Sequence, residues 1–398
     1  MTNFYRPGGT GIDHHDPMED ELMHRILVGT DALQGVPAPL IAVSFLINAL
    51  IVALTWSSPL EPAGHPIVMV VISLITSFGV WGMLWLLPRA NRSWGPEKPS
   101  ALALSALITL LLALLGLLNA PLWLGIALPL LLWAAAFYAT WIEPFRLGVT
   151  RQKLASPKWR GQPLRVLHIG DIHVERISPR ERRLNALIES LRPDVIVFSG
   201  DFVNLSYNGD ARAKDEIREI IRQWQAPLGV YCVPGTPLVE SLERVAEFVR
   251  GIDQITLLAN RWVTLTSPDG DRINVCGMIT THLLPQDRER VASLGKLAPA
   301  DGVNLLLTHS PDVAPEAARA GFDLYLCGHT HGGQIRLPII GPLATASALG
   351  RRFVMGRKQV DGMTIYTSRG VGMEGLGAPR ARFLCPPEII IWDFSTSP

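Results

Sequence analysis

Charged residues are almost missing from one long stretch of this chain, about residues 38–140 of 398. Four apolar runs in this stretch contain no Asp, Glu, Lys, Arg or His. Each run has about 20 residues, the length that a helix needs to cross a hydrocarbon layer. A soluble domain rarely keeps four such runs free of charge. We therefore expect four transmembrane helices, over residues 39–56, 67–87, 101–118 and 121–140.

The chain also lacks an excess of either charge, because its formal net charge is only +1. This balance gives no indication of nucleic acid or of an acidic partner. Cysteine is scarce, and none of the four cysteines forms a CxxC pair. Their spacing suits neither a zinc ribbon nor a disulfide framework, so we expect reduced, buried thiols. The acidic N-terminal segment and the repeated apolar runs argue against a secretory signal peptide.

Lys and Arg are distributed unevenly among the loops between the apolar runs. Residues 88–100 and the stretch after the fourth run carry several of them, whereas residues 57–66 and 119–120 carry none. By the positive-inside rule, both termini and the globular region face the cytoplasm. We expect a multi-pass protein of the inner membrane, with the lipid bilayer as its partner. The runs lack ionisable groups, which favours an anchor over a transport route.

The rest of the chain has the pattern of an α/β domain. Short β-branched runs alternate with amphipathic stretches, which predicts strands at 164–169, 195–199, 229–233, 272–279, 304–307, 323–327, 363–367 and 389–392. Helices are expected at 179–191, 211–224 and 238–249. The predicted organisation is a cytoplasmic segment at 1–37, four transmembrane helices at 38–142, a linker at 143–162 and a catalytic domain at 163–398.

Asp and His side chains follow four of the predicted strands. The first strand leads into Asp171 and His173, and the second leads into Asp201. Two later strands lead into His309 and into the sequence Gly328-His-Thr-His331. Ligands of open α/β sheets bind at the carboxyl ends of strands, and carboxylates and imidazoles are ligands that first-row divalent metals accept. One such residue alone is more often a helix cap or a turn residue, but four strand ends in this order predict a metal site.

These motifs resemble those of the calcineurin-like metallophosphoesterases, in particular a membrane-associated branch with a GHTHGGQ motif. The resemblance covers about residues 165–394. It implies an α/β/β/α sandwich that binds two divalent metal ions (Mn, Fe, Zn or Mg). It assigns Asp171, His173 and His331 to the first ion, Asp201 as a carboxylate that bridges both ions, and His309 and His329 to the second ion.

One motif of the family is altered in this chain. Where the family has Gly-Asn-His-Asp/Glu, the sequence reads Gly235-Thr236-Pro237-Leu238. Thr236 takes the place of an Asn that ligates the second metal. Pro237 takes the place of a His that donates a proton or stabilises the leaving group, and proline has no side-chain donor. The second metal site is therefore expected to be weakened.

The resemblance implies hydrolysis of a phosphodiester, phosphomonoester or pyrophosphate bond by metal-activated hydroxide. Asp201 and His309 are the expected catalytic residues among the ligands. Asn204, Arg369 and His282 are candidates for contacting phosphate or for replacing the missing acid. The expected substrate is a phosphorylated small molecule or a lipid, since the anchor keeps the domain near a membrane. The alternative is a catalytically impaired membrane protein that binds metal and acts by binding.

Overall fold

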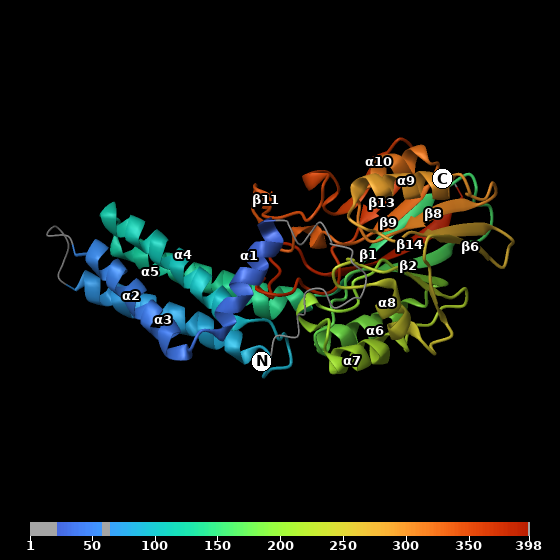
Figure 1. The fold of residues 1–398 in the computed structure, drawn as a ribbon. Helices are drawn as coiled ribbons and strands as arrows, with labels where there is room; N and C mark the ends of the chain where they lie inside the picture. Colours follow the sequence, from blue (N-terminus) through green and yellow to red (C-terminus); the bar gives the residue numbers. More distant parts are fainter. Residues whose placement is uncertain (1–21, 58–63, 397–398) are drawn as a thin grey trace. The chain divides into compact units, whose positions relative to one another are not determined.

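The computed structural model describes residues 22–57 and 64–396, so the first 21 residues of the predicted cytoplasmic segment lie outside the described part. The chain divides into two compact units (Figure 1). A helical unit contains Leu22–Ile142 together with the short segment Glu374–Ala381. Among the described residues, a globular unit contains the chain from Glu143 to Met373 and the chain from Arg382 onward.

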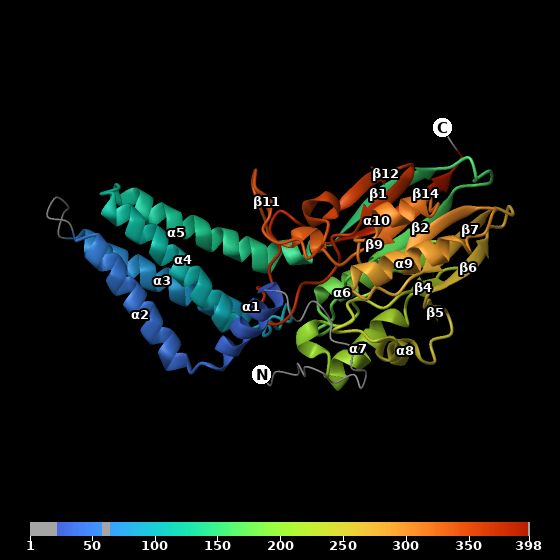
Figure 2. The ribbon, with the colours of Figure 1, turned by 45° about the horizontal axis from the view of Figure 1, so that its top comes forward.

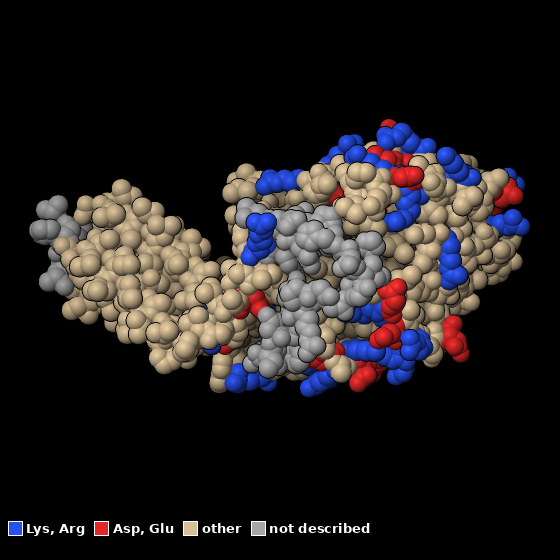
Figure 3. All heavy atoms as spheres, viewed as in Figure 1, with Lys and Arg blue, Asp and Glu red and all other residues tan. Residues whose placement is uncertain are grey.

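The helical unit confirms the four apolar runs as long helices. After α1 (Leu22–Asp31) come α2 (Ala38–Thr55), α3 (His65–Leu86), α4 (Glu97–Leu117) and α5 (Leu122–Phe137), which continues into a π-helical turn at Tyr138–Ile142. All four are long and apolar enough to cross a membrane, with mean hydropathies from 1.9 to 2.4. Their visible face is almost free of charged side chains (Figure 3).

Polar side chains inside the helical unit hydrogen-bond to one another across helices. Asn48 Nδ2 of α2 donates to Ser105 Oγ of α4 over 2.9 Å, and Ser105 Oγ lies 2.8 Å from Ser77 Oγ of α3. Such bonds join helices in an apolar medium, where a polar group needs a partner. The helix α4 begins one turn before its apolar run because Pro96 precedes it and Pro99 lies in its first turn, where a proline is tolerated.

The globular unit contains two six-stranded mixed sheets. The first has the order β1-β14-β2-β3-β4-β5, and the second has the order β12-β13-β9-β8-β7-β6. The strands of the first sheet are β1 (Gly148–Ala155), β2 (Leu164–Ile169), β3 (Val195–Phe198), β4 (Val230–Cys232), β5 (Ile255–Leu257) and β14 (Glu388–Ser395). Those of the second are β6 (Arg261–Thr266), β7 (Arg272–Gly277), β8 (Val303–Leu307), β9 (Leu324–Cys327), β12 (Gly356–Val360) and β13 (Met363–Thr367).

The sheets pack face to face, and helices cover their outer faces (Figures 1 and 2). Strand residues alternate between the faces, so that Val195 and Val197 of β3 enter a core shared with Leu305 and Leu307 of β8. Helices α6 (Pro179–Leu191), α7 (Ala211–Ile221) and α8 (Leu242–Val249) lie on the first sheet, and α9 (Leu284–Gly295) and α10 (Ala314–Arg319) lie on the second. This arrangement is the α/β/β/α sandwich expected from the sequence.

Several elements differ from the sequence-based prediction. The strand β1 forms within residues 143–162, where a linker is expected, and it pairs in parallel with β14. Its alternating Arg151 and Lys153 are exposed, which is typical of an edge strand. The helix α8 begins at Leu242, four residues later than expected, because Ser241 caps it. A two-stranded hairpin, β10 (Arg336–Leu337) and β11 (Gly341–Pro342), was not expected.

Candidate metal centre

The predicted ligands come from both sheets. Asp171 and His173 follow β2, and Asp201 follows β3, in the first sheet. His309 follows β8, and His329 and His331 follow β9, in the second sheet. Both pairs of strands are parallel neighbours, so their carboxyl ends meet at one edge of the sandwich. The six side chains are buried there.

The backbone at these positions is unusual. Five of the six residues have a φ in the left-handed region, which non-glycine residues seldom adopt: Asp171 (50°), His173 (40°), Asp201 (61°), His329 (71°) and His331 (50°). Such conformations cost about 1–3 kcal/mol each, and they persist where the surrounding structure holds them for a function. The strain at these turns is thus concentrated on the residues that the sequence singles out.

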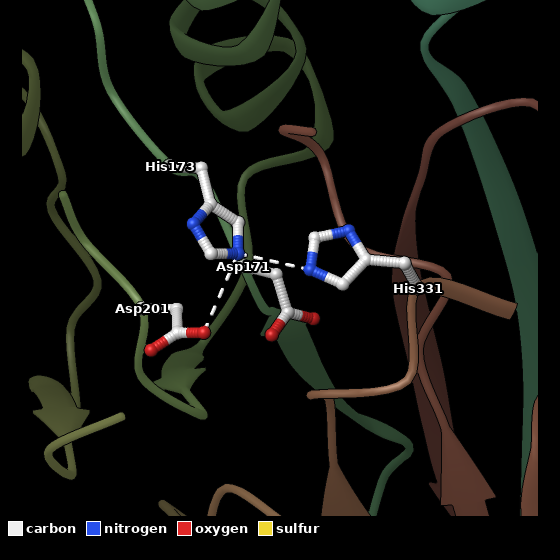
Figure 4. A group of neighbouring side chains, drawn as sticks. All are labelled: Asp171, His173, Asp201 and His331. Atoms are coloured by element: carbon white, nitrogen blue, oxygen red, sulfur yellow. Dashed lines mark hydrogen bonds and ion pairs between the residues drawn. The ribbon is translucent and has the colours of Figure 1, made fainter. Parts of the chain in front are cut away.

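The first half of the cluster consists of Asp171, His173, Asp201 and His331 (Figure 4). One ligand atom from each lies within 4.8 Å of all the others. The Nε2 atoms of His173 and His331 face each other at 2.9 Å, and His173 Nε2 lies 3.3 Å from Asp201 Oδ2. Two imidazole nitrogens and a carboxylate oxygen that converge in this way are suited to share one cation.

The second half continues from the same carboxylate. His309 Nε2 lies 3.2 Å from Asp201 Oδ2, and His329 Nδ1 lies 3.2 Å from His309 Nε2. The other ring nitrogen of His309 lies 2.9 Å from the carbonyl oxygen of Ser199. A proton on that Nδ1 leaves the lone pair of Nε2 free to face the cluster, which is how a metal-binding imidazole is usually oriented. Asp201 therefore stands between the two halves.

Thr236 lies where the altered motif predicts it. Its backbone N–H donates to Asp201 Oδ1 over 2.7 Å, and its hydroxyl lies 3.2 Å from Asp201 Oδ2 and 3.1 Å from His309 Nε2. The hydroxyl thus contacts the second half of the cluster at the place of the expected amide. The adjacent Pro237 provides no hydrogen-bond donor there.

The residues present fit divalent cations. Within residues 22–57 and 64–396, the buried Asp171 Oδ2 has no hydrogen-bond partner. A buried carboxylate oxygen without a partner is costly, and a cation would satisfy it. Gly328 and Gly370 lie so close to the Asp171 carboxylate that a Cβ atom at either position would overlap with it. Two carboxylates and four imidazoles form a donor set for first-row divalent metals.

The charges of the cluster are strongly coupled. Burial raises the pKa of Asp171 to about 6, with a smaller contribution from the Asp201 carboxylate that His309 opposes. Burial alone would also raise the pKa of Asp201, but His309 and His173 hold it well below its usual value. Burial acts to lower the pKa of His309, yet the Asp201 and Asp171 carboxylates outweigh it and raise the pKa to about 9. The surroundings of Asp201 thus favour positive charge, and a bound cation would supply that charge.

Two buried ionisable residues that sequence reasoning missed, Glu240 and Arg382, hold the turns of the site. The Glu240 carboxylate accepts the backbone N–H groups of Asp201, Phe202, Val203 and Gly235. It therefore ties the Asp201 turn to the loop that carries Thr236. An acidic residue shortly after the altered motif was the available signal, but its partners are backbone groups that the sequence does not place.

Arg382 is the other buried charged residue near the site. Its guanidinium donates to the carbonyl oxygens of Arg369, Gly372 and Cys385. Gly372 in turn packs against the backbone of Ile172 and the Cβ atom of His173. Arg382 therefore fixes the loop that lies against the first half of the cluster, and nothing in the local sequence pattern indicates this.

The other predicted site residues have contacts of their own. Asn204 Nδ2 donates to the carbonyl oxygen of Met373 over 2.9 Å, and Arg369 Nη2 pairs with Glu388 Oε2 at 2.6 Å. The ring of His282 lies 4.9 Å from the ring of His329, measured between centroids. His282 also lines a pocket of about 80 Å³ together with His329, Thr280, Ser310 and Asp312. The roles of Asn204, Arg369 and His282 toward phosphate remain predictions.

A two-sheet sandwich with Asp and His side chains at one edge has the architecture and donor set that suit a metal-dependent hydrolase. Residues 164–333 match the family model described as calcineurin-like phosphoesterase. These residues of the globular unit therefore form a calcineurin-like phosphoesterase domain, which confirms the resemblance to this family seen in the sequence.

Three relatives illustrate the match. An uncharacterized metallophosphoesterase, YkuE of Bacillus subtilis, is 29% identical over 65% of this chain and 90% of its own length. The phosphodiesterase YaeI of Escherichia coli is 28% identical over 63% of this chain and 90% of its own length. The UDP-2,3-diacylglucosamine pyrophosphatase LpxG of Chlamydia trachomatis is 25% identical over 67% of this chain and 94% of its own length.

Proposed function

We propose that this protein is a membrane-anchored phosphoesterase that uses two divalent metal ions and hydrolyses a phosphodiester or pyrophosphate bond of a lipid-linked substrate. The observation that carries the proposal is the convergence of Asp171, His173, Asp201 and His331, with one ligand atom from each within 4.8 Å of the others. His309 and His329 extend this cluster across Asp201. The four apolar helices support an anchor, and the relative LpxG supports a lipid-linked pyrophosphate.

The six predicted ligands would bind two metal ions. Asp171, His173 and His331 would hold one ion, His309 and His329 the other, and Asp201 both. The ions would supply Lewis acidity that lowers the pKa of water and neutralises phosphoryl charge. Burial of all six side chains excludes bulk water and strengthens these electrostatic interactions. His282, whose ring lies 4.9 Å from the ring of His329, would donate a ring N–H to a phosphoryl oxygen.

The Lys and Arg distribution of the sequence supports an orientation with the globular unit in the cytoplasm and the helices in the inner membrane. A cytoplasmic metal centre next to the membrane would reach phosphate groups of lipids in the inner leaflet. Accessibility of an introduced surface cysteine to an impermeant maleimide, in intact cells and in opened cells, tests this orientation.

The proposed activity is tested with the full-length protein in detergent and bis(p-nitrophenyl) phosphate as substrate, with added Mn²⁺. We expect turnover that chelation removes and that Asp201→Ala abolishes. Asp361→Asn is the matched control, since Asp361 is an exposed carboxylate in the turn between β12 and β13. Turnover that survives in Asp201→Ala would contradict a metal-dependent mechanism at this site.

A second function rests on a specific observation, the proline at position 237. A protein that keeps six ligands but lacks this donor could bind metal and a phosphorylated lipid without turning it over. Wild-type protein that binds two Mn²⁺ ions and a phospholipid headgroup, but shows no hydrolysis of any phosphodiester or pyrophosphate, would favour this binding role.

A further inference from the structure

The hairpin β10–β11 carries apolar side chains that face solvent within its unit. At its tip, Ile339 is 107% exposed and Ile340 is 55% exposed, and Leu343, which follows β11, is 61% exposed. Single exposed apolar residues are common on proteins, but several neighbouring ones at the end of a projecting element mark an interaction site. β11 stands out from the sheets and helices of the globular unit (Figures 1 and 2).

The tip is also strained. Ile340 N–H donates to the carbonyl oxygen of Pro338 over 2.7 Å, which closes a three-residue turn around Ile339. Ile339 has a φ of 68°, and a γ-turn with a positive central φ is rare and strained. For a β-branched residue this conformation is an outlier, whereas Gly or Asn would adopt it readily. An isoleucine is unfavourable at this position, because its apolar side chain is exposed and its backbone is in the left-handed region. Its presence there indicates a function for the side chain.

Two arginines hydrogen-bond to the backbone of the hairpin and of the segment that leads into it. Arg351 donates to the carbonyl oxygens of Ile340 and Pro342 over 2.8 and 3.1 Å, and Arg336 donates to that of Gly332 over 2.8 Å. Guanidinium groups beside exposed apolar side chains suit an element that inserts into a membrane surface. The apolar side chains enter the acyl region, while the arginines remain at the level of the lipid phosphates.

We propose that the tip of this hairpin, Pro338 to Ile340, inserts into the bilayer that holds helices α2–α5. This inference rests on the membrane anchorage in the proposed function. The few side chains at the tip offer far less area than the ~800 Å² per partner of a stable protein interface. A membrane needs no such area, because the spans of the same chain keep the surface at a high effective concentration.

Insertion would position the metal centre. The hairpin begins at Arg336, five residues after His331, and Gly333 packs so closely on Pro342 that a Cβ atom there would overlap with it. Ile335 forms a bridge with Phe383, which fixes the base of the hairpin on the globular unit. A tip held in the lipid would thus keep the turn that carries His331 at the membrane surface, within reach of a phosphate that is attached to a lipid.

The test uses the full-length protein in nanodiscs of phosphatidylglycerol and phosphatidylcholine, with an environment-sensitive fluorophore on Ile339→Cys. The four native cysteines are buried, so the introduced thiol is labelled selectively. Leu50→Cys on α2 serves as the control for a span, and Asp361→Cys serves as the control for a solvent-exposed site. We expect blue-shifted emission and quenching by doxyl-labelled lipids at positions 339 and 50, but not at 361.

Each outcome decides the proposal. A label at 339 that behaves like the label at 361, while position 50 is quenched, overturns the insertion and leaves the anchorage intact. Loss of quenching at position 50 as well overturns both. A blue shift at 339 without quenching by doxyl-labelled lipids shows a protein partner or a second copy of the chain and overturns insertion.

Turnover supplies an independent readout. We expect Ile339→Asp to reduce hydrolysis of a phosphodiester lipid in the bilayer about tenfold and to leave hydrolysis of bis(p-nitrophenyl) phosphate unchanged. Ile339→Leu keeps the apolar tip and should retain both activities. Equal loss on both substrates in Ile339→Asp would show damage to the metal centre and would overturn the proposed role of the tip. Absence of both activities in the wild type would instead contradict the proposed function, whatever the fluorophore reports.

Discussion

The two halves of the ligand cluster are built on the same two sheets, but they differ in how many of the family's ligand and donor side chains they keep. Asp171, His173 and His331 form the first half with unaltered motifs, and their ligand atoms converge with that of Asp201. The second half retains His309 and His329 but has Thr236 and Pro237 in the altered motif. Comparing the two halves distinguishes the contacts that shape the loops from the side chains that bind metal or donate protons.

The backbone frame of the second half is intact despite the altered side chains. Thr236 N–H still donates to Asp201, and Glu240 still ties the Thr236 loop to the Asp201 turn. The substitutions therefore change the available donors while the positions of the ligands are kept. Weakening of the second ion and loss of a proton donor are the consequences that experiments can separate.

The largest effect is expected for His331→Ala, which removes a ligand of the intact half. Changes in residues that only support metal ligands cost about 10–100-fold, so loss of a direct ligand should lower kcat/KM by more than about 100-fold. Metal content, measured by atomic emission after desalting, should fall by about one ion. An unchanged metal content would show that the first ion is held elsewhere.

A proton donor at position 237 should have the next largest effect. A positioned general acid contributes about 10²–10⁴ in rate, so Pro237→His should raise kcat by about 100-fold if that donor is missing. Pro237→Asn is the matched control, because it also removes the proline ring but is a poor acid. Equal rates for wild type and Pro237→His would indicate that another group, with His282 as the first candidate, already fills the role.

The contrast between the halves also shows which parts could be predicted from the sequence. The sequence predicts Asp171, Asp201, His309 and His331 as neighbours because each follows a buried strand, and parallel strands bring their ends to one edge. Thr236 was found through its place in the motif. Glu240 was missed because its partners are backbone N–H groups that only the folded turns bring together. β1 was missed because an edge strand with alternating basic residues resembles a linker.

Glu240→Gln tests the hydrogen bonds that hold the Asp201 turn and the Thr236 loop together. The amide has one acceptor oxygen in place of two, which leaves buried N–H groups of the Asp201 turn or of Gly235 without a partner. A buried donor without a partner costs about 1–3 kcal/mol, so we expect a loss of about 2 kcal/mol and a lower Tm in detergent. Glu219→Gln, an exposed carboxylate on α7, should leave the Tm unchanged. An equal Tm for Glu240→Gln would mean that the turns hold their shape without the carboxylate.

The smallest expected effect, and the one that addresses the altered motif most directly, comes from Thr236. The Thr236 hydroxyl contacts both Asp201 and His309, so Thr236→Val should weaken binding of the second Mn²⁺ ion about tenfold, a change of about 1.4 kcal/mol. Thr236→Ser keeps the hydroxyl and should bind both ions as the wild type does. Thr236→Asn restores an amide oxygen and should bind the second ion more tightly. Calorimetric titration of the metal-free protein with Mn²⁺ resolves the two binding events. If Val and Ser bind the second ion equally, the hydroxyl takes no part in the site, and His309, His329 and Asp201 hold that ion alone.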